Sequence, residues 1–179
     1  MKRLGFVVIV MLAAVSLFPG TANAATPTSY QFHLEVPNVT ADSHGDRVAV
    51  TGDGRFTEDP KSVSGGGSFT HFMADDGSVT GTWVANELLE FQSYGCGVVL
   101  GNPISPNACG GALKMRVTLT ATVGGTTMTR DGILTVFCII GPNPPNSHDD
   151  PTGEGIHLLV PGITNFNKIV SGGNVFIKE

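Results

Sequence analysis

The chain has 179 residues, with 10 Lys and Arg against 15 Asp and Glu, and its formal net charge is −5. An acidic chain without a cluster of basic residues lacks the charge that binding to a phosphate backbone requires, so we expect no nucleic-acid partner. Glycine, a poor helix former, occurs 24 times, and this disfavours a helical fold.

The first 24 residues have the pattern of a secretory signal peptide. Lys2 and Arg3 precede an apolar run over residues 4–18, and Ala22-Asn23-Ala24 supplies small residues for cleavage after Ala24. The apolar run is shorter than the roughly 20 residues that a membrane-spanning helix needs. We therefore predict that residues 1–24 are removed, and that residues 25–179 form a single secreted or periplasmic domain without a membrane association.

Segments that alternate apolar and polar residues follow one another along the rest of the chain, with turn signals between them. In chain order, the predicted strands are residues 30–36, 47–57, 67–73, 78–85, 88–94, 114–123, 126–140, 155–160 and 174–177. The pattern predicts an all-β fold, an antiparallel meander of about eight or nine strands. A β-barrel is the first choice because short hairpins join neighbouring strands, and a two-sheet β-sandwich is the alternative.

Gly52 and Gly54 share the apolar face of the predicted strand 47–57 with Val48, Val50 and Phe56. Glycines in a core-facing row mark a bulge, a sharp bend at a barrel corner, or the close approach of a ligand or another backbone. We interpret these two as a barrel corner.

Residues 64–83, SGGGSFTHFMADDGSVTGTW, contain the strongest candidate site. The glycines lack both the spacing and the following helix of a phosphate-binding loop, so we interpret them as the entry to a strand. A three-residue turn at Asp75-Asp76-Gly77 would give a hairpin with Gly77 in the left-handed conformation. That register pairs His71 with Gly81, Phe69 with Trp83 and Met73 with Val79, and it directs His71 inward.

An inward histidine has two interpretations. The simpler one is a buried ring whose polar atoms are satisfied by hydrogen bonds. The functional one applies if the strands enclose a pocket with an open mouth. Phe69, His71, Met73 and Trp83 would then bind a ligand, and His71 is the only candidate for a catalytic general base.

The chain has three cysteines, and export would permit a disulfide. A Gly124-Gly125 turn between strands 114–123 and 126–140 pairs Gly111 with Cys138 and makes Cys109 a diagonal neighbour of Cys138. We expect a Cys109–Cys138 disulfide, with Cys96–Cys109 as the alternative.

Metal-capable side chains gather near the loop 141–155 and just after it. The weak candidates are His148, Asp149, Asp150 and His157, but their spacing matches no zinc or calcium template. We therefore expect neither a metal site nor a cofactor.

Together these patterns favour a non-catalytic ligand-binding or interaction module, whose small-molecule or protein ligand the sequence does not identify. The alternative is a small secreted barrel enzyme that acts on an apolar or saccharide ligand with His71 as general base. A serine nucleophile is not indicated, because the chain has no G-x-S-x-G motif.

Overall fold

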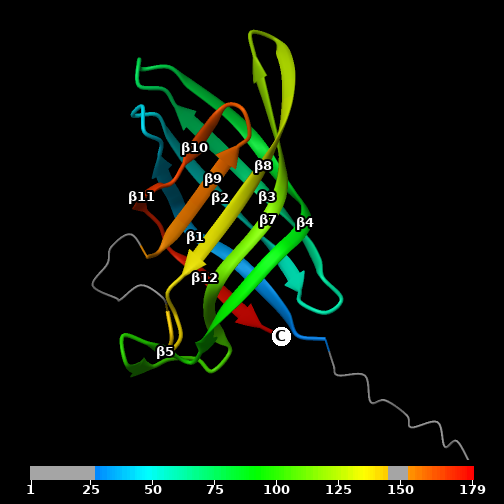
Figure 1. The fold of residues 1–179 in the computed structure, drawn as a ribbon, viewed down its shortest axis with the longest axis vertical. Coiled ribbons are helices and arrows are strands. Elements are labelled where there is room, and N and C mark those ends of the chain that lie inside the picture. The colour runs from blue at the N-terminus through cyan, green and yellow to red at the C-terminus, as the bar shows by residue number, and fades with distance from the viewer. Residues whose placement is uncertain (1–26, 145–152) are drawn as a thin grey trace, which may run out of the picture.

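The computed structural model describes residues 27–144 and 153–179, and all the regular structure in these two ranges is β-strand (Figure 1). No helix within the described ranges has the length and apolar character needed to cross a membrane. The predicted signal peptide and the metal candidates His148, Asp149 and Asp150 lie outside the described residues.

Twelve strands form in the described part of the chain. They are β1 (Ser29–Ala41), β2 (Arg47–Thr57), β3 (Ser62–Phe72), β4 (Ser78–Cys96), β5 (Val98–Val99), β6 (Asn102–Pro103), β7 (Ala108–Val123), β8 (Thr126–Cys138), β9 (Gly155–Val160), β10 (Thr164–Phe166), β11 (Lys168–Ser171) and β12 (Asn174–Lys178). All pairings between them are antiparallel.

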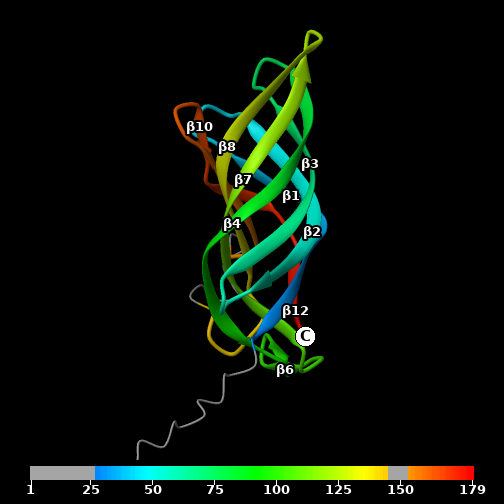
Figure 2. The same cartoon turned by 90° about the vertical axis from the view of Figure 1, so that its right-hand side faces the viewer.

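The sheet topology combines two meanders. Strands β1 to β4 lie side by side in chain order, and so do strands β7 to β10. Strand β12 lies between β1 and β7 and joins the two meanders. Because β4 also pairs with β7, hydrogen-bonded neighbours lead from β4 through β3, β2, β1, β12 and β7 back to β4, in a partial ring (Figure 2). The predicted antiparallel all-β fold is confirmed, and the choice between barrel and sandwich stays a prediction.

Several strands differ in length from their predicted ranges. Strand β4 is one long strand where two were expected, and bulges between Ala85 and Glu87 and between Leu88 and Glu90 let it bend where the prediction broke it. Strands β3 and β7 begin five or more residues before their predicted starts, in glycine-containing segments. The short strands β5, β6, β10 and β11 were not predicted.

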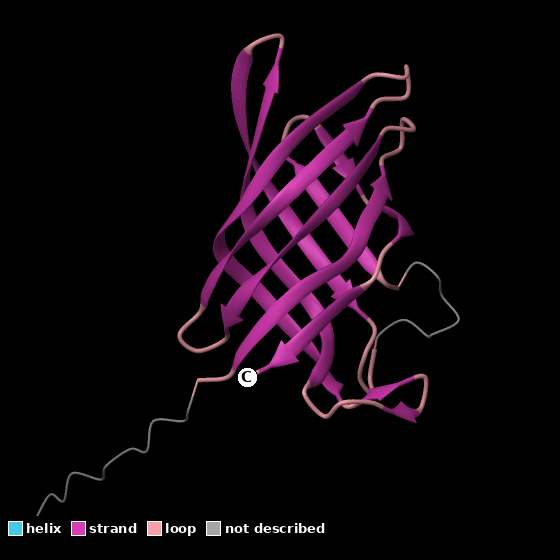
Figure 3. Cartoon of the chain, turned by 180° about the vertical axis from the view of Figure 1, so that it is seen from behind, coloured by secondary structure: helices cyan, strands magenta, loops and turns pink. Residues whose placement is uncertain are grey.

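Aromatic rings fill one half of the interior. The rings of Tyr30 and Phe56 stack with centroids 4.9 Å apart, and the centroid of Phe91 lies 4.6 Å from that of Phe56. Phe176 meets both phenylalanines edge-on. These residues come from the start of β1, the end of β2, the later part of β4 and β12, so the aromatic cluster lies at the end of the structure away from the β1–β2 turn. The C-terminus lies at this same end (Figure 3).

The glycines of β2 and β3 permit close packing in the middle of the interior. A Cβ at Gly54 would lie 2.6 Å from ring atoms of Phe32, and one at Gly52 would lie 2.6 Å from the ring of Trp83. A Cβ at Gly67 would overlap the carbonyl oxygen of Thr51 on the neighbouring strand. The glycines therefore permit a close approach of aromatic rings and of the neighbouring backbone, which was an alternative to the barrel corner that the sequence favoured.

The disulfide joins Cys96 to Cys109, so the preferred Cys109–Cys138 pairing is wrong and the alternative is formed. The β7–β8 register predicted from the Gly124-Gly125 turn is confirmed, with Gly111 opposite Cys138. Cys109 nevertheless has a nearer partner, because β4 places Cys96 directly opposite it. Cys138 stays a buried thiol that donates to the carbonyl oxygen of Cys109 at 3.5 Å, and burial raises its pKa to about 12.

Candidate functional site

The β3–β4 hairpin forms in a different register from the predicted one. The N–H of Met73 donates to the carbonyl oxygen of Gly77 at 2.8 Å, so the three-residue turn is Ala74 to Asp76. Asp76, at φ 68°, takes the left-handed conformation that was expected of Gly77. Aspartate enters this region more readily than most residues do, and the turn therefore forms one residue earlier than predicted.

The new register places each large ring against a glycine. Phe69 lies opposite Gly81, and Trp83 lies opposite Gly67. A Cβ at Gly81 would approach the Phe69 ring to 2.6 Å. The predicted register would instead set two bulky rings, Phe69 and Trp83, directly against each other. The register shift is even in number, so His71 keeps its inward face and now lies opposite Val79.

A cavity of about 210 Å³ lies at the end of the structure opposite the aromatic cluster. The β1–β2, β3–β4, β7–β8 and β9–β10 turns gather at this end, which is uppermost in Figure 1. Most of the cavity wall is apolar, and its polar residues are few. The lining residues are Val48, Phe69, His71, Leu119, Ala121, Met128, Arg130, Leu158, Val160, Ile163, Thr164 and Phe166.

Two of the four predicted ligand-binding residues, Phe69 and His71, line this cavity. Trp83 lies elsewhere, in the core, with 1% of its surface exposed, and its Nε1 donates to the carbonyl oxygen of Thr51 at 2.9 Å. Met73 also lies outside the lining and packs against its own turn, at Gly77.

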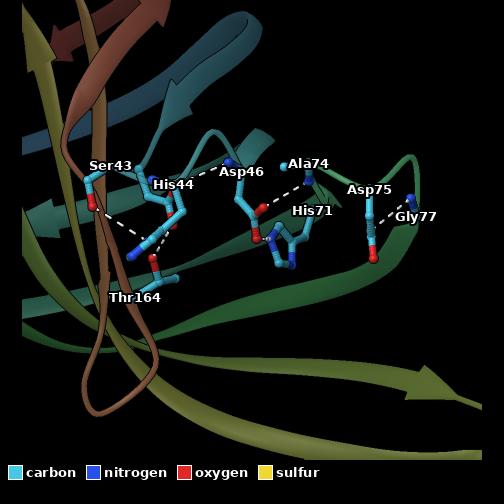
Figure 4. Close-up of polar contacts among 9 residues, drawn as sticks. Ser43, His44, Asp46, His71, Ala74, Asp75, Gly77 and Thr164 are labelled. Carbon is cyan, nitrogen blue, oxygen red and sulfur yellow. Dashed lines mark hydrogen bonds and ion pairs between the residues drawn. The ribbon is translucent and has the colours of Figure 1, made fainter.

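Asp46 orients His71 at the edge of the cavity (Figure 4). The Nε2 of His71 lies 2.9 Å from Oδ2 of Asp46, and the ring meets the Phe166 ring edge-on with centroids 5.4 Å apart. A carboxylate only accepts hydrogen bonds, so the Nε2 atom carries a proton and Nδ1 of the neutral ring is the acceptor. The side chain of His71 is 28% exposed, so it is neither sealed in the core nor fully in solvent.

Two aspartates of the β1–β2 turn connect the strands around the cavity (Figure 4). Asp46 also accepts the N–H of Ala74 at 2.9 Å. The buried Asp42 accepts the hydroxyl of Thr164 at 2.7 Å and the N–H of Asp46 at 3.1 Å. We call Asp42, Asp46, His71 and Thr164 the rim network, because it ties the β1–β2 turn to β3 on one side and to β10 on the other.

Hydrogen bonds hold Asp42 in its charged form. Burial acts to raise its pKa, but the bonds from the Thr164 hydroxyl, from the N–H and ring of His44, and from the N–H of Asp46 outweigh burial. The pKa of Asp42 is lowered to about 2. The rim network is therefore built on a carboxylate that stays ionised at any ordinary pH.

The cavity opens to solvent between the β7–β8 hairpin and the β9–β10 turn. Met128 and Ile163 line it and are nevertheless 42% and 61% exposed. Arg130, which is also exposed, lines the cavity and donates from Nη1 to the carbonyl oxygen of Thr129 at 2.8 Å. None of the ion pairs within residues 27–144 and 153–179 includes Arg130.

Sequence reasoning missed Asp42, Asp46, Thr164 and Phe166, because the turns that place them around the cavity have no register that can be read from the sequence. Arg130 did have a signal. The confirmed β7–β8 register sets it opposite Leu119, in an otherwise apolar inward-facing row. A charged residue in such a row indicates either a bulge or an open mouth, and here it marks the mouth.

The remaining metal candidate, His157, lies on β9. His157 packs edge-on against Phe137, with centroids 4.9 Å apart, and burial lowers its pKa. Nearby, Glu154 accepts the N–H groups of Ile139 and Asn174 at 2.8 and 2.6 Å, which joins the end of β8 to the start of β12. Across the described ranges, no three metal-capable side chains gather in one place.

Comparison of the chain with protein-family models, with curated proteins and with solved structures finds no match.

Proposed function

We propose that the protein is an exported, non-catalytic binding module that holds a small, mainly apolar ligand in the cavity at the open end of a β-barrel. The observation that carries this proposal is the cavity of about 210 Å³ with a largely apolar wall. It exceeds the roughly 150 Å³ of a dry engineered cavity that takes up benzene. A ligand of about eight carbon atoms would fill it by the same proportion.

The surroundings of the cavity suit a preformed site. The aromatic cluster and the partial ring of strands hold the closed end, and the rim network holds the turns at the open end. Ligand sites are commonly apolar hollows with a few placed polar groups and little rearrangement on binding. Such a lining favours an apolar ligand over a saccharide.

Export is supported by two separate features. The N-terminal pattern of Lys2, Arg3, an apolar run and Ala22-Asn23-Ala24 is that of a cleaved signal peptide. The Cys96–Cys109 disulfide is of a kind that persists in oxidising compartments outside the cytosol.

Filling the cavity should abolish binding. Ala121 lines the cavity, whereas Thr120 is its neighbour on the opposite face of β7. We expect isothermal titration calorimetry to show saturable one-to-one binding of octanol to the wild type. Ala121→Leu should weaken this binding by about tenfold or more, because its three additional carbon atoms occupy part of a hollow of fixed size. Thr120→Leu, the matched control, should leave the affinity within about twofold. Equal binding by both variants, or no binding by the wild type, would refute the proposal.

A second candidate function is supported by the contact between His71 and Asp46. A histidine oriented by a carboxylate at the edge of an apolar cavity is arranged as a general base requires, with Nδ1 left to accept a proton. In this alternative the protein is a small secreted enzyme that acts on the ligand in the cavity. We rank it second because no nucleophile or second catalytic group contacts His71 in the described part of the chain.

The alternative is tested by the hydrolysis of 4-nitrophenyl octanoate. If His71 is a base, His71→Gln should lower the rate at least a hundredfold while octanol still binds, since general-base catalysis is worth about that much or more. A rate for His71→Gln equal to that of the wild type rejects the enzyme and leaves the binding module.

A further inference from the structure

Among the residues that the structure describes, the mouth of the cavity carries a positive charge without a matching negative one. Any charge that His71 acquires is matched by Asp46, which lies 2.9 Å away. Arg130 has no such partner, since no carboxylate of the described residues lies within ion-pair distance of it. Its guanidinium uses one hydrogen-bond donor on the carbonyl of Thr129, and an arginine has five.

The position of Arg130 relative to the apolar wall sets the direction of a ligand. The buried wall includes Leu158 and Phe166, both at most 3% exposed, whereas Arg130 shares the mouth with the exposed Met128 and Ile163. An apolar chain would therefore enter first and lie inside. A polar head would remain at the mouth, within reach of the guanidinium.

The chemistry of Arg130 selects the charge of that head. A guanidinium binds carboxylate and phosphate oxygens through two parallel hydrogen bonds, and it repels cations. We propose that the ligand is a single-chain amphiphile of about eight carbons with an anionic head, either carboxylate or phosphate, that binds Arg130. This inference rests on the proposed function, because it assumes that the cavity is a binding site.

The test compares four probes that share one octyl chain and differ in the head: octanoate, octyl phosphate, octanol and octyltrimethylammonium. Their affinities are measured by calorimetry for the wild type, Arg130→Gln and Lys114→Gln. Lys114 is exposed on the opposite face of β7 from the cavity lining, so its variant makes the same change in net charge away from the mouth.

We expect Arg130→Gln to lower the affinity for octanoate and for octyl phosphate by about fivefold or more, and to leave the affinity for octanol within about twofold of the wild-type value. Octyltrimethylammonium should bind the variant as well as or better than the wild type. Lys114→Gln should leave all four affinities within about twofold, and added salt should weaken only the two anions. A stronger loss for octanoate than for octyl phosphate would identify a carboxylate head, and the reverse order a phosphate head.

The two proposals fail in different ways. If all four probes bind the wild type and Arg130→Gln changes none of them selectively, the cavity is a binding site but the anionic head is wrong. If octanol binds and both anions do not, the head is likewise wrong. If none of the four binds, the binding function itself is overturned, and this inference with it.

Discussion

Asp42 shows how one buried carboxylate can organise the open end of the molecule. Its two oxygens accept hydrogen bonds from within the β1–β2 turn and from Thr164 on β10. These bonds favour the charged form, and they lower the pKa of Asp42 to about 2. In an unfolded chain the bonds are absent and the pKa is near 3.8. Asp42 therefore stabilises the fold above about pH 4, and this stabilisation is lost as the pH falls from there through about 2.

Thr164→Val should reveal this contribution. The substitution keeps the shape of the side chain and removes one hydrogen bond to a charged group, which is worth about 1.5–3 kcal/mol. We expect the free energy of unfolding, measured with urea, to fall by about that much at pH 7. The difference in unfolding free energy between the variant and the wild type should shrink below about pH 3. Without the Thr164 hydroxyl the pKa of Asp42 is less lowered, so Asp42 loses its charge at a higher pH in the variant than in the wild type.

The matched control is Thr40→Val. Thr40 is fully buried and donates to the carbonyl oxygen of Lys168 at 3.0 Å, so its hydrogen bond involves no titrating group. Thr40→Val should lower the free energy of unfolding by the same amount at pH 7 and at pH 3. A Thr164→Val difference that also stays constant with pH would show that Asp42 is not what the hydroxyl stabilises.

At the scale of elements, the sequence predicts which segments form strands and which side chains share a face of a strand. The register of each hairpin depends on its turn. The Gly124-Gly125 turn has one favoured form, and the register read from it is confirmed down to the Leu119–Arg130 pair. The Ala-Asp-Asp-Gly turn admits two placements one residue apart, and the predicted placement is wrong. What decides between them is the packing of Phe69 against Gly81 and of Trp83 against Gly67. That choice follows from side-chain volume across the strands rather than from turn residues alone.

Gly67→Ala tests the close packing of β2 against β3. The added Cβ would overlap the carbonyl oxygen of Thr51, which is backbone and cannot move aside cheaply. We expect the substitution to lower the free energy of unfolding by about 3 kcal/mol.

Gly132→Ala on β8 is the control for this substitution. There the nearest atoms to an added Cβ lie 3.3 Å away, and two of the three belong to side chains. Its cost should be below about 1 kcal/mol. Equal costs at the two positions would mean that the glycines of β3 do not serve close packing.

At the scale of the whole molecule, the two ends of the interior differ, because aromatic rings fill one end and a cavity occupies the other. Tyr30, Phe56, Phe91 and Phe176 close one end with stacked and edge-on rings. The other end keeps a cavity that four turns surround. The sequence predicts an inward row on each strand but not this division, because it depends on non-local pairings. The insertion of β12 between β1 and β7 and the approach of β10 to His71 join residues far apart in the chain.

The same non-local pairings explain the mixed outcome for the site. Phe69 and His71 were predicted from a local hairpin, and they line the cavity because alternation along a strand survives an even register shift. Asp46 and Phe166 reach His71 from other strands, and Cys96 reaches Cys109 through the β4–β7 pairing. No local pattern in the sequence contains these contacts.

The central claim, that the cavity binds a small apolar ligand, is tested most directly by the methyl NMR signals of methionine. Beyond residue 24 the chain has three methionines: Met128 lines the cavity, Met115 is buried in the core, and Met73 packs at the β3–β4 turn. During titration with octanol, the Met128 signal should shift saturably, while those of Met115 and Met73 stay nearly unchanged. A Met128 signal that does not move, or three signals that drift together without saturation, would contradict the claim.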